Sequence, residues 1–357
     1  MISLAYDTLK LPKRISLAIS RGTRSESRLA WVRLTSGDLK GWGEAGEYSI
    51  GSHGCTLEGI LEGLEIAKGL LEHADPLDRR GIDLSLAAAG CNTSVRSAVN
   101  QALWDWLGLK VGLPVYQLLG TTSAGAPPCS VTIGIAPPDE AVDRVRKWNE
   151  LGVFRAWKVK LGSPAGLDFD RLMFSAVLQA LPAGALISVD ANGGWTLPQA
   201  IVMCRWLADH GVEHVEQPLA RGQEADLTEL RRESRMPLIA DESCLSSREI
   251  PALAGRVDGI NIKLFKCGGF DEALRMIATA RAHGLRVMLG CYGNTLLSNT
   301  AAAHLGGLVD YVDLDSHWNL VGDPFEGATL HQGALTPSAR PGFGVTYVPT
   351  HQATIPS

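Results

Sequence analysis

The chain has 357 residues, of which 45% are hydrophobic, and its formal net charge is −5. This length allows one large domain and a smaller one, and the mildly acidic charge argues against nucleic acid as a partner. No run of about 18 apolar residues occurs, so neither a membrane-spanning helix nor a membrane partner is expected. The N-terminus also lacks the apolar core and cleavage site of a signal peptide. Seven cysteines without C-x-x-C spacing indicate free thiols in a reducing cytoplasm.

The first 120 residues are predicted to form an α+β domain in which an antiparallel sheet precedes helices. Alternating apolar and polar residues at the N-terminus indicate a first strand, a turn at Pro12 and a second strand. A linker rich in Gly, Ala and Pro follows this domain. The remaining expected elements are strands at 28–34 and 41–47, helices at 56–71 and 94–107, and the linker at 121–128.

From Cys129 onward, short apolar strands alternate with helical stretches, which predicts a closed parallel barrel rather than an open sheet. No convincing eighth helix follows the eighth strand. The predicted fold is therefore α/β: a (β/α)7β modified TIM barrel at 121–323, an α+β capping domain at 1–120, and a tail at 324–357 that returns to the capping domain. The expected strands are 130–133, 156–160, 186–190, 214–216, 238–241, 259–263, 286–289 and 311–313.

Acidic residues end three consecutive strands of this predicted barrel. Asp190, Glu216 and Asp241 stand where such barrels place their active sites. Carboxylates that converge repel one another, and they stay ionised together only around a cation. Oxygen ligands alone select a hard ion, with Mg²⁺ as the first candidate. A strand-end cap or a surface salt bridge would explain a single such Asp, but three consecutive strands favour a metal site.

Lysines flank the acidic trio. Lys158 and Lys160 are two residues apart on one strand and share a face, whereas Lys263 ends a strand across the barrel. An exposed strand edge would also explain the first pair, but the acidic trio favours the barrel interior. An interior lysine near another ammonium group and a metal is expected to have a lowered pKa and to act as a general base. Lysines on both sides of a bound carbon provide the geometry for stereochemical inversion.

This set of residues suits removal of a proton next to a carboxylate. The product of that step is a dianionic enediolate, which a divalent ion chelating both carboxylate oxygens stabilises by several kcal/mol. A lysine base together with Mg²⁺ on an ene-diolate is the pairing found in the enolase superfamily.

Five motifs then occur in order: K-x-K, V-D-A-N, E-Q-P, A-D-E-S and N-I-K-L-x-K-C-G-G. With them the chain resembles the enolase superfamily, in its muconate-lactonizing-enzyme-like subgroup, over essentially its full length. The resemblance implies one Mg²⁺ bound by the acidic trio. Strand seven ends in V-M-L-G-C-Y-G-N without a histidine, which disfavours the mandelate-racemase-like subgroup.

The same resemblance implies roles for the lysines. Lys160 and Lys263 correspond to the acid/base pair, and Lys158 would orient the substrate and lower the pKa of Lys160. Lys266 is a competing candidate. However, Lys263 stands five residues before Gly268, as the catalytic lysine of the family does.

Two further segments point to dipeptide substrates. Asp313 and Asp315 form a D-x-D sequence that resembles the signature of dipeptide epimerases, and two carboxylates on one strand face can bind a primary ammonium group. A turn or a surface pair is the alternative. The stretch 20–25 resembles the mobile capping loop of L-Ala-D/L-Glu epimerases. There an arginine binds the glutamate side chain, and here Arg24, or else Arg21, is expected to do so.

The sequence thus predicts a cytoplasmic, Mg²⁺-dependent dipeptide epimerase, with L-Ala-D/L-Glu as the leading substrate and reuse of cell-wall peptides as its purpose. A homo-oligomer is compatible with this prediction. The nearest alternatives are other reactions of the subgroup: N-acylamino acid racemisation, o-succinylbenzoate synthesis and muconate cycloisomerisation. A Schiff-base aldolase would leave the acidic trio unexplained, and an inactive binding protein would leave the filled lysine positions unexplained.

Overall fold

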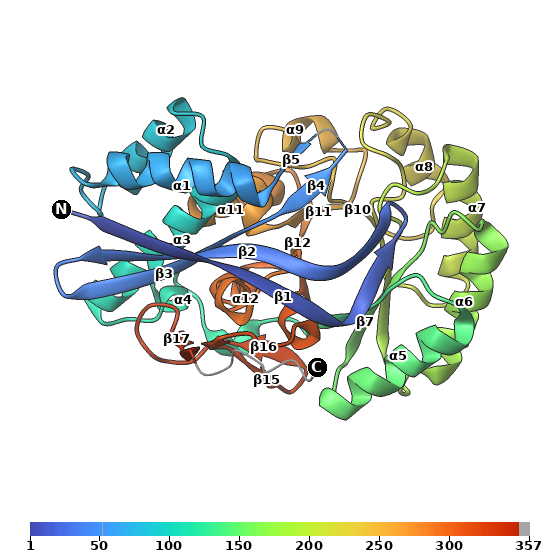
Figure 1. The fold of residues 1–357 in the computed structure, drawn as a ribbon. Coiled ribbons are helices and arrows are strands. Elements are labelled where there is room, and N and C mark those ends of the chain that lie inside the picture. Colours follow the sequence, from blue (N-terminus) through green and yellow to red (C-terminus); the bar gives the residue numbers. More distant parts are fainter. Residues whose placement is uncertain (52, 350–357) are drawn as a thin grey trace.

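A three-stranded antiparallel sheet and three longer helices form the N-terminal part of the protein (Figure 1). The computed structural model describes residues 1–51 and 53–349. The sheet has the strand order β1-β2-β3, and a small hairpin, β4-β5, follows it. The elements are β1 (Ser3–Ile19), β2 (Gly22–Ser36), β3 (Leu39–Gly46), β4 (Tyr48–Ile50), β5 (His53–Cys55), α1 (Leu57–Leu71), α2 (Arg79–Ala88), α3 (Thr93–Val111) and α4 (Val115–Leu118).

The predicted turn at Pro12 is wrong, because β1 continues through this residue as one strand of 17 residues. The register with β2 shifts between Pro12 and Leu17, so a bulge absorbs the irregularity. β1 lies at the edge of its sheet, where proline is tolerated because its missing N–H is not needed by a further strand. The continuous strand makes a long β1–β2 hairpin.

Strand β3 packs unusually close to helix α3. A Cβ atom added at Gly43 would lie 2.0 Å from the carbonyl oxygen of Ala98, which is backbone and has little freedom to move. Gly41 makes the same kind of approach to Ala102, with a distance of 2.1 Å. Glycine is therefore required at both positions to seat the sheet on its helix.

We expect Gly43→Ala to lower the free energy of unfolding by about 1–3 kcal/mol, as overpacking of a tight core does. Chemical denaturation measures this loss. Gly69→Ala on α1 is the matched control, because a Cβ there meets nothing within 4 Å and alanine favours a helix by about 0.5–1 kcal/mol. Equal stability of the Gly43→Ala protein and the native chain would contradict the close packing.

Eight parallel strands, β6 to β13, follow in chain order around a barrel. A bridge between Cys129 and Val312 joins the first strand to the last and closes it. The strands are β6 (Ser130–Ile133), β7 (Ala156–Lys160), β8 (Leu186–Asp190), β9 (Val215–Glu216), β10 (Leu238–Ala240), β11 (Gly259–Ile262), β12 (Arg286–Gly290) and β13 (Tyr311–Asp313). The predicted barrel with a capping α+β unit is therefore confirmed.

Helices cover the outside of the barrel and connect its strands. They are α5 (Pro138–Leu151), α6 (Leu167–Ala180), α7 (Leu197–Ala208), α8 (Leu227–Glu233), α9 (Ile250–Leu253), α10 (Leu264–Cys267), α11 (Phe270–Ala282) and α12 (Leu296–Ala303). After β13 the described chain has only a 3₁₀ turn, Ser316–Asn319, in place of an eighth helix. The apolar core of the barrel is one continuous cluster of strand and helix side chains.

The C-terminal segment contacts the antiparallel sheet. Its short strands are β14 (Phe325–Glu326), β15 (Thr329–His331), β16 (Ala334–Thr336) and β17 (Thr346–Tyr347), and β14 pairs with β17. Tyr347 stacks on Trp42 of β3, with ring centroids 5.5 Å apart, and Phe325 meets the same ring edge-on at 5.8 Å. The division of the chain at residues 120 and 323 stays a prediction.

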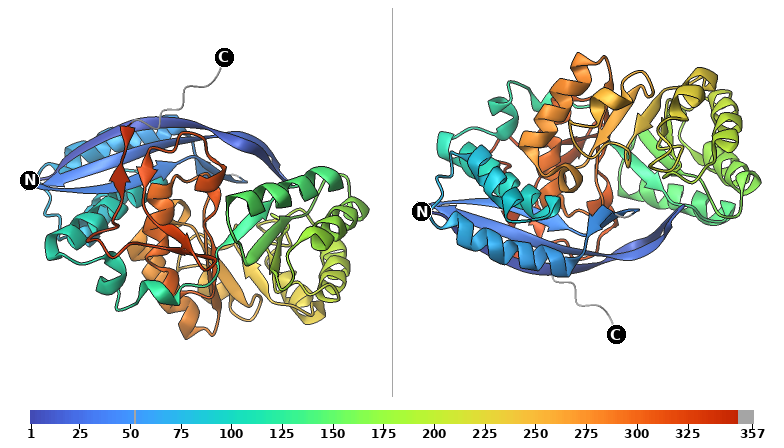
Figure 2. Two further views of the ribbon diagram at one scale, coloured as in Figure 1. Left: turned by 90° about the horizontal axis from the view of Figure 1, so that it is seen from below. Right: turned by 90° about the horizontal axis from the view of Figure 1, so that it is seen from above.

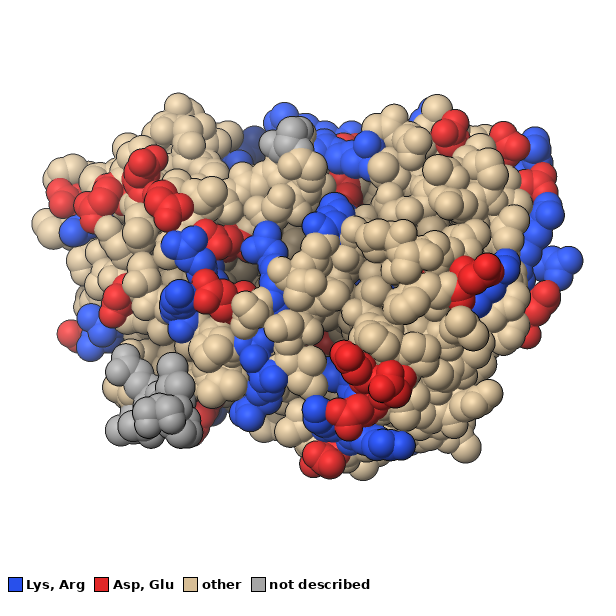
Figure 3. Space-filling model, turned by 45° about the vertical axis from the view of Figure 1, so that its right-hand side comes forward, with Lys and Arg blue, Asp and Glu red and all other residues tan. Residues whose placement is uncertain are grey.

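The β1–β2 hairpin reaches from the cap onto the barrel, as the two views in Figure 2 show. Ala18 accepts a hydrogen bond from the backbone N–H of Ile135 at 2.9 Å, and the Ser20 hydroxyl donates to the carbonyl of Asn192 at 3.0 Å. The hairpin tip therefore rests on loops that follow barrel strands. Basic and acidic side chains are interspersed on the face drawn in Figure 3. No helix of the described residues is both long and apolar enough to cross a membrane.

Candidate active site

A cavity of about 610 Å³ lies between the β1–β2 hairpin and the barrel. Its wall on the hairpin side includes Leu17, Ile19 and Leu29, which are apolar. Its wall on the barrel side includes Lys160 and Lys263, which come from β7 and the end of β11. The two predicted acid/base lysines thus face one cavity, whose hairpin side carries both apolar and charged residues.

Strand register brings charged side chains to one level of the barrel. Lys160 pairs with Asp190, and Asp190 pairs with Glu216, across β7, β8 and β9. Side chains at paired positions of parallel strands point to the same side of the sheet, here into the barrel. All three are buried. Asp241 follows β10, two residues beyond Ile239, the register partner of Glu216.

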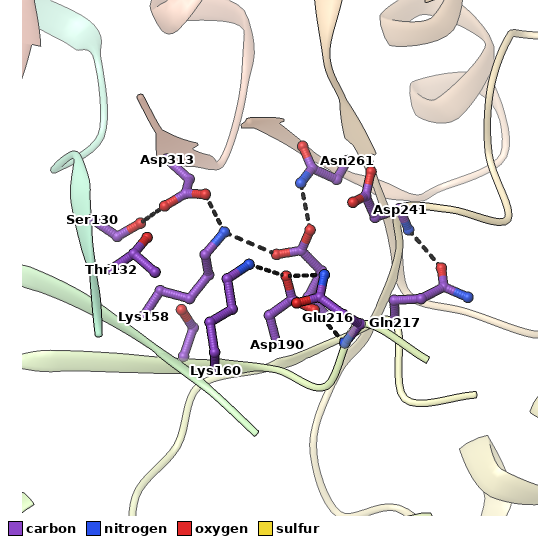
Figure 4. A network of polar contacts seen from close by, with 12 residues as sticks. Ser130, Thr132, Lys158, Lys160, Asp190, Glu216, Gln217, Asp241, Asn261 and Asp313 are labelled. Carbon is purple, nitrogen blue, oxygen red and sulfur yellow. Dashed lines mark hydrogen bonds and ion pairs between the residues drawn. The ribbon is translucent and has the colours of Figure 1, made fainter. Parts of the chain in front are cut away.

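Each carboxylate of the acidic trio faces a lysine, and Figure 4 shows the contacts of Lys160 with Asp190 and of Lys158 with Glu216. Lys160 Nζ lies 2.5 Å from Asp190 Oδ2, and Lys158 Nζ lies 3.3 Å from Glu216 Oε2. In the third ion pair, Lys263 Nζ lies 2.8 Å from Asp241 Oδ2. In a buried ion pair the close partner offsets part of the cost of taking each charge out of water.

The three carboxylates also interact with one another. Burial and the nearby Glu216 raise the pKa of Asp190 to about 7, although Lys160 and Lys158 oppose this shift. Burial and Asp241 would raise the pKa of Glu216, but Lys158, Lys263 and Lys160 outweigh them and lower it to about 2. Burial opposes ionisation of Asp241 as well, yet Lys263 and Lys266 hold its pKa far below the usual range. The protonation of each of these carboxyl groups therefore depends on the charges of its neighbours.

The lowered lysine pKa, expected beside a second ammonium group and a metal, stays a prediction. In the structure the pKa values of Lys158 and Lys263 are raised. Burial lowers both, but carboxylates outweigh it: Asp313 and Glu216 raise the pKa of Lys158 well above its usual value, and Asp241 and Glu216 raise that of Lys263. The prediction weighed ammonium neighbours and a metal, whereas the groups that face these lysines in the structure are carboxylates.

Lys266 differs from Lys263 in the number of partners its ammonium group has. Its Nζ donates to Asp241 Oδ1 at 2.6 Å, to the Asp241 carbonyl at 2.7 Å and to the Asn261 carbonyl at 2.9 Å. These three bonds use all three hydrogens of the ammonium. Lys266 does not line the 610 Å³ cavity, whereas Lys263 does. The geometry favours Lys263 as the residue that can reach a substrate.

Three amide side chains hold the acidic residues, two at the carboxylates and one at a backbone N–H, and the sequence analysis gave them no role. Asn192 donates to Asp190 from its backbone at 2.7 Å and from its side chain at 3.0 Å. Asn261 Nδ2 donates to Glu216 Oε1 at 2.6 Å, and Gln217 Oε1 accepts from the Asp241 N–H at 2.9 Å. The motifs D-A-N, E-Q-P and N-I-K contain all three, so their position next to a charged residue was the available signal.

Asn192 and Gln217 also adopt the left-handed backbone conformation, with φ of 45° and 36°. Residues other than glycine adopt it at a cost of about 1–3 kcal/mol, and such strain clusters at functional sites. Each strained residue follows a carboxylate-bearing strand end. The Asn192 amide turns back to Asp190, whereas the Gln217 amide holds the backbone N–H of Asp241. The strain is therefore tied to the orientation of the acidic trio.

The donor set fits a hard divalent cation in its chemistry: three buried carboxylates and nearby amide oxygens. Asn192 Oδ1 and Glu242 Oε2 are buried and have no hydrogen-bond partner among the described residues. The carboxylates are nevertheless turned toward lysines. Within residues 1–51 and 53–349, no three acidic, His or Cys side chains are gathered as metal ligands.

Asp313 and Asp315 do not form a free pair of carboxylates in the structure. Asp313 is an ion-pair partner of Lys158 and accepts from the Ser130 hydroxyl at 2.7 Å. Asp315 Oδ2 accepts from the backbone N–H of Thr132 at 2.7 Å. Burial and Asp313 raise the pKa of Asp315, so the two are close enough to interact. Neither lines the 610 Å³ cavity.

The two candidate arginines occupy different positions. Arg24 lines the cavity at the hairpin side and is exposed. Arg21 also lines it, but its guanidinium is bound to Glu242 Oε1 at 2.7 Å and to the Asn192 carbonyl at 2.7 Å. Arg21 therefore ties the hairpin to the barrel, which leaves Arg24 as the better candidate for a substrate side chain.

Strand β12 ends at Gly290, beside Lys263. A Cβ at this position would lie 2.7 Å from the side-chain amide of Asn261 and 2.8 Å from Lys263 Cε. We expect Gly290→Ala to displace both side chains and to lower turnover by about 10²-fold, because a shift of about 1 Å in a reacting group has an effect of this size. Turnover by a stably folded variant at the native rate would contradict this expectation.

Known protein families match both parts of this chain. The enolase C-terminal domain-like model matches residues 140–350, and the mandelate racemase / muconate lactonizing enzyme N-terminal domain model matches residues 5–120. The protein therefore belongs to the enolase superfamily, in its muconate-lactonizing-enzyme-like group. Its chain is 42% identical to a hydrophobic dipeptide epimerase of Roseobacter litoralis over 351 residues, covering 96% of this chain and 98% of that protein.

Two further comparisons extend this similarity. An L-Ala-D/L-Glu epimerase of Bacteroides thetaiotaomicron is 33% identical, with coverage of 96% of this chain and 88% of that protein. A dipeptide epimerase of Enterococcus faecalis, solved with Mg and the dipeptide L-Leu-L-Tyr, superposes with a TM-score of 0.90 at 29% identity. That comparison covers 97% of this chain and 99% of the other.

Proposed function

We propose that the protein is a divalent-metal-dependent dipeptide epimerase that inverts the Cα of the C-terminal residue by two-base proton transfer. One observation carries the proposal: Lys160 and Lys263, from β7 and the end of β11, line one cavity, and each contacts a carboxylate of a different strand end. Relatives named dipeptide epimerases, 42% identical over nearly the whole chain, support the class of reaction.

In this proposal, Lys160 and Lys263 stand on opposite faces of the substrate Cα. One lysine removes the proton, and the other delivers a proton to the opposite face. Lys158 orients the substrate carboxylate. Asp190, Glu216 and Asp241 would hold one Mg²⁺, which would supply electrostatic stabilisation of the negative charge that proton removal creates.

Asp313 and Asp315 are proposed to bind the N-terminal ammonium group of the dipeptide. Their carboxylates lie near Lys158 at the end of β13, so a positive group placed there meets two negative charges. Replacing both residues by Asn should then abolish turnover of a dipeptide. Subgroup reactions on substrates without a free ammonium, such as N-acylamino acid racemisation, would tolerate this change.

The substrate side chain is proposed to be hydrophobic. Two relatives at 42% identity are named hydrophobic dipeptide epimerases, and the apolar side chains Leu17, Ile19 and Leu29 line the cavity. L-Ala-D/L-Glu is the second candidate, because Arg24 lines the same cavity and a guanidinium suits a carboxylate.

A screen of L,L-dipeptides in D₂O tests the function, with loss of the Cα proton signal of the C-terminal residue followed by NMR. Exchange with hydrophobic dipeptides supports the main proposal, and exchange with Ala-Glu alone supports the second candidate. If no dipeptide exchanges, the proposed function is wrong. Arg24→Leu is the accompanying variant, because only the acidic substrate should lose affinity with it.

The proposal includes a cytoplasmic setting, in which the enzyme would act on peptides released from the cell wall, and a homo-oligomeric state. All seven cysteines are free thiols, which fits a reducing compartment. It also includes the division of the chain into a capping domain, a barrel domain and a returning tail at residues 120 and 323.

A further inference from the structure

One aromatic side chain of the cavity lies directly against a proposed catalytic lysine. Tyr292 follows β12 and lines the cavity. The Nζ atom of Lys263 lies over its ring, 4.7 Å from the centroid. A cation within about 6 Å of an aromatic centroid is attracted by the electron-rich face of the ring. The cation–π contacts among the described residues include Lys263 but not Lys160.

The Tyr292 ring is itself fixed from the cap. It stacks on Tyr48 of β4, with centroids 5.1 Å apart and an interplanar angle of 15°. The Tyr48 hydroxyl and the Thr93 hydroxyl, at the start of α3, are 2.7 Å apart in a hydrogen bond. Both rings pack on an apolar cluster that includes Leu29 and Phe265. A chain of contacts thus runs from the capping helix through two rings to the Lys263 ammonium.

Hydrogen bonds alone hold the Lys263 ammonium group less firmly than that of Lys266. Lys263 Nζ makes a hydrogen bond of 2.8 Å to Asp241, whereas Lys266 Nζ makes three bonds. A single bond leaves a flexible four-carbon side chain free to swing about its acceptor. The hydroxyl of Tyr292 is buried and has no hydrogen-bond partner among the described residues. The ring rather than the hydroxyl therefore makes the contact with the ammonium.

We propose that Tyr292 is a positioning residue that holds the Lys263 ammonium against the cavity through its ring, and that the cap stabilises this position through Tyr48. The inference rests on the proposed function, because it assigns Lys263 to one face of the substrate Cα. This role for Tyr292 would make the two proton transfers differ in what they depend on. Only the step at the Lys263 face depends on this aromatic contact between cap and barrel.

Single-lysine backgrounds separate the two faces. In Lys160→Met, the remaining base is Lys263, and in Lys263→Met it is Lys160. We expect Tyr292→Leu to slow Cα deuterium exchange at least about tenfold in the first background and less than about threefold in the second. Tyr292→Phe should restore most of the lost rate, because phenylalanine keeps the ring. Thermal unfolding of each variant checks that the fold persists.

Three results overturn the proposal. Equal slowing in both backgrounds would mean that Tyr292 has a general structural role. An effect of Tyr292→Phe as large as that of Tyr292→Leu would mean that the hydroxyl acts. No slowing in the Lys160→Met background would mean that the contact has no consequence.

A measurement without substrate keeps this test separate from the proposed function. In crystal structures, Lys263 Nζ should leave its position in Tyr292→Leu and keep it in Tyr292→Phe, while Lys160 stays in place in both. An unmoved Lys263 in Tyr292→Leu overturns the proposal even if no dipeptide is epimerised. Absence of exchange by the native protein would instead refute the epimerase function alone.

Discussion

Replacing Lys263 by methionine is expected to lower the rate of dipeptide epimerisation by about 10²- to 10⁴-fold, the usual range for loss of a general acid or base. Lys160→Met should have an effect of the same size, because inversion needs a proton donor and a proton acceptor on opposite faces. The side chains of both residues line the cavity, one from β7 and the other from the end of β11. Steady-state kinetics by polarimetry or circular dichroism measure both rates.

Lys147→Met is the matched control for these substitutions. Lys147 lies on α5, and both side chains of its ion pair with Asp143 are exposed. Its removal should therefore change stability and turnover little. Retention of more than about a tenth of the native rate in either cavity variant would contradict the two-base assignment, given the size of general acid–base effects.

Removal of divalent metal with EDTA is expected to lower turnover by at least about 10³-fold, because a metal ion at a developing enediolate contributes several kcal/mol. Added Mg²⁺ should restore the rate. Glu216→Gln should weaken Mg²⁺ binding, which isothermal titration calorimetry measures on the folded protein. This substitution removes the negative charge of the carboxylate while keeping the shape of the side chain.

Glu62→Gln serves as the control, because Glu62 is an exposed residue of α1 and does not line the cavity. Full activity in EDTA would contradict the proposal and favour a lysine that reacts with a carbonyl group, as in a Schiff-base aldolase. Trapping of a lysine by borohydride with a carbonyl substrate would then identify that residue.

The barrel was predictable because its strands are short apolar runs separated by helices, each ending in a charged residue. That pattern placed Lys160, Asp190 and Glu216 at one level, and the strand register agrees. The continuation of β1 through Pro12 was not predictable. The local pattern indicates a turn at this proline, but an edge strand with a bulge tolerates it. Helix α2 was missed because it has only two buried residues, Ile82 and Leu86.

Partners within the candidate site depend on three-dimensional contacts that spacing does not reveal. The sequence placed Asp313 at the end of a strand, but not its ion pair with Lys158, two strands away around the barrel. It likewise placed Arg21 in a loop, but not its contact with Glu242, which lies 221 positions further along the chain. Tyr292 drew no attention, because only the folded chain brings its ring against Lys263. Residue identities were therefore easier to predict than their pairings.

Deuterium exchange at the substrate Cα by the two single-lysine variants tests the central claim most directly. Each variant is incubated in D₂O with the L,L-dipeptide and, separately, with its L,D epimer. The account predicts that Lys160→Met exchanges one epimer only and that Lys263→Met exchanges only the other. Exchange of the same epimer by both variants would place the two amines on one face of the carbon and contradict the account.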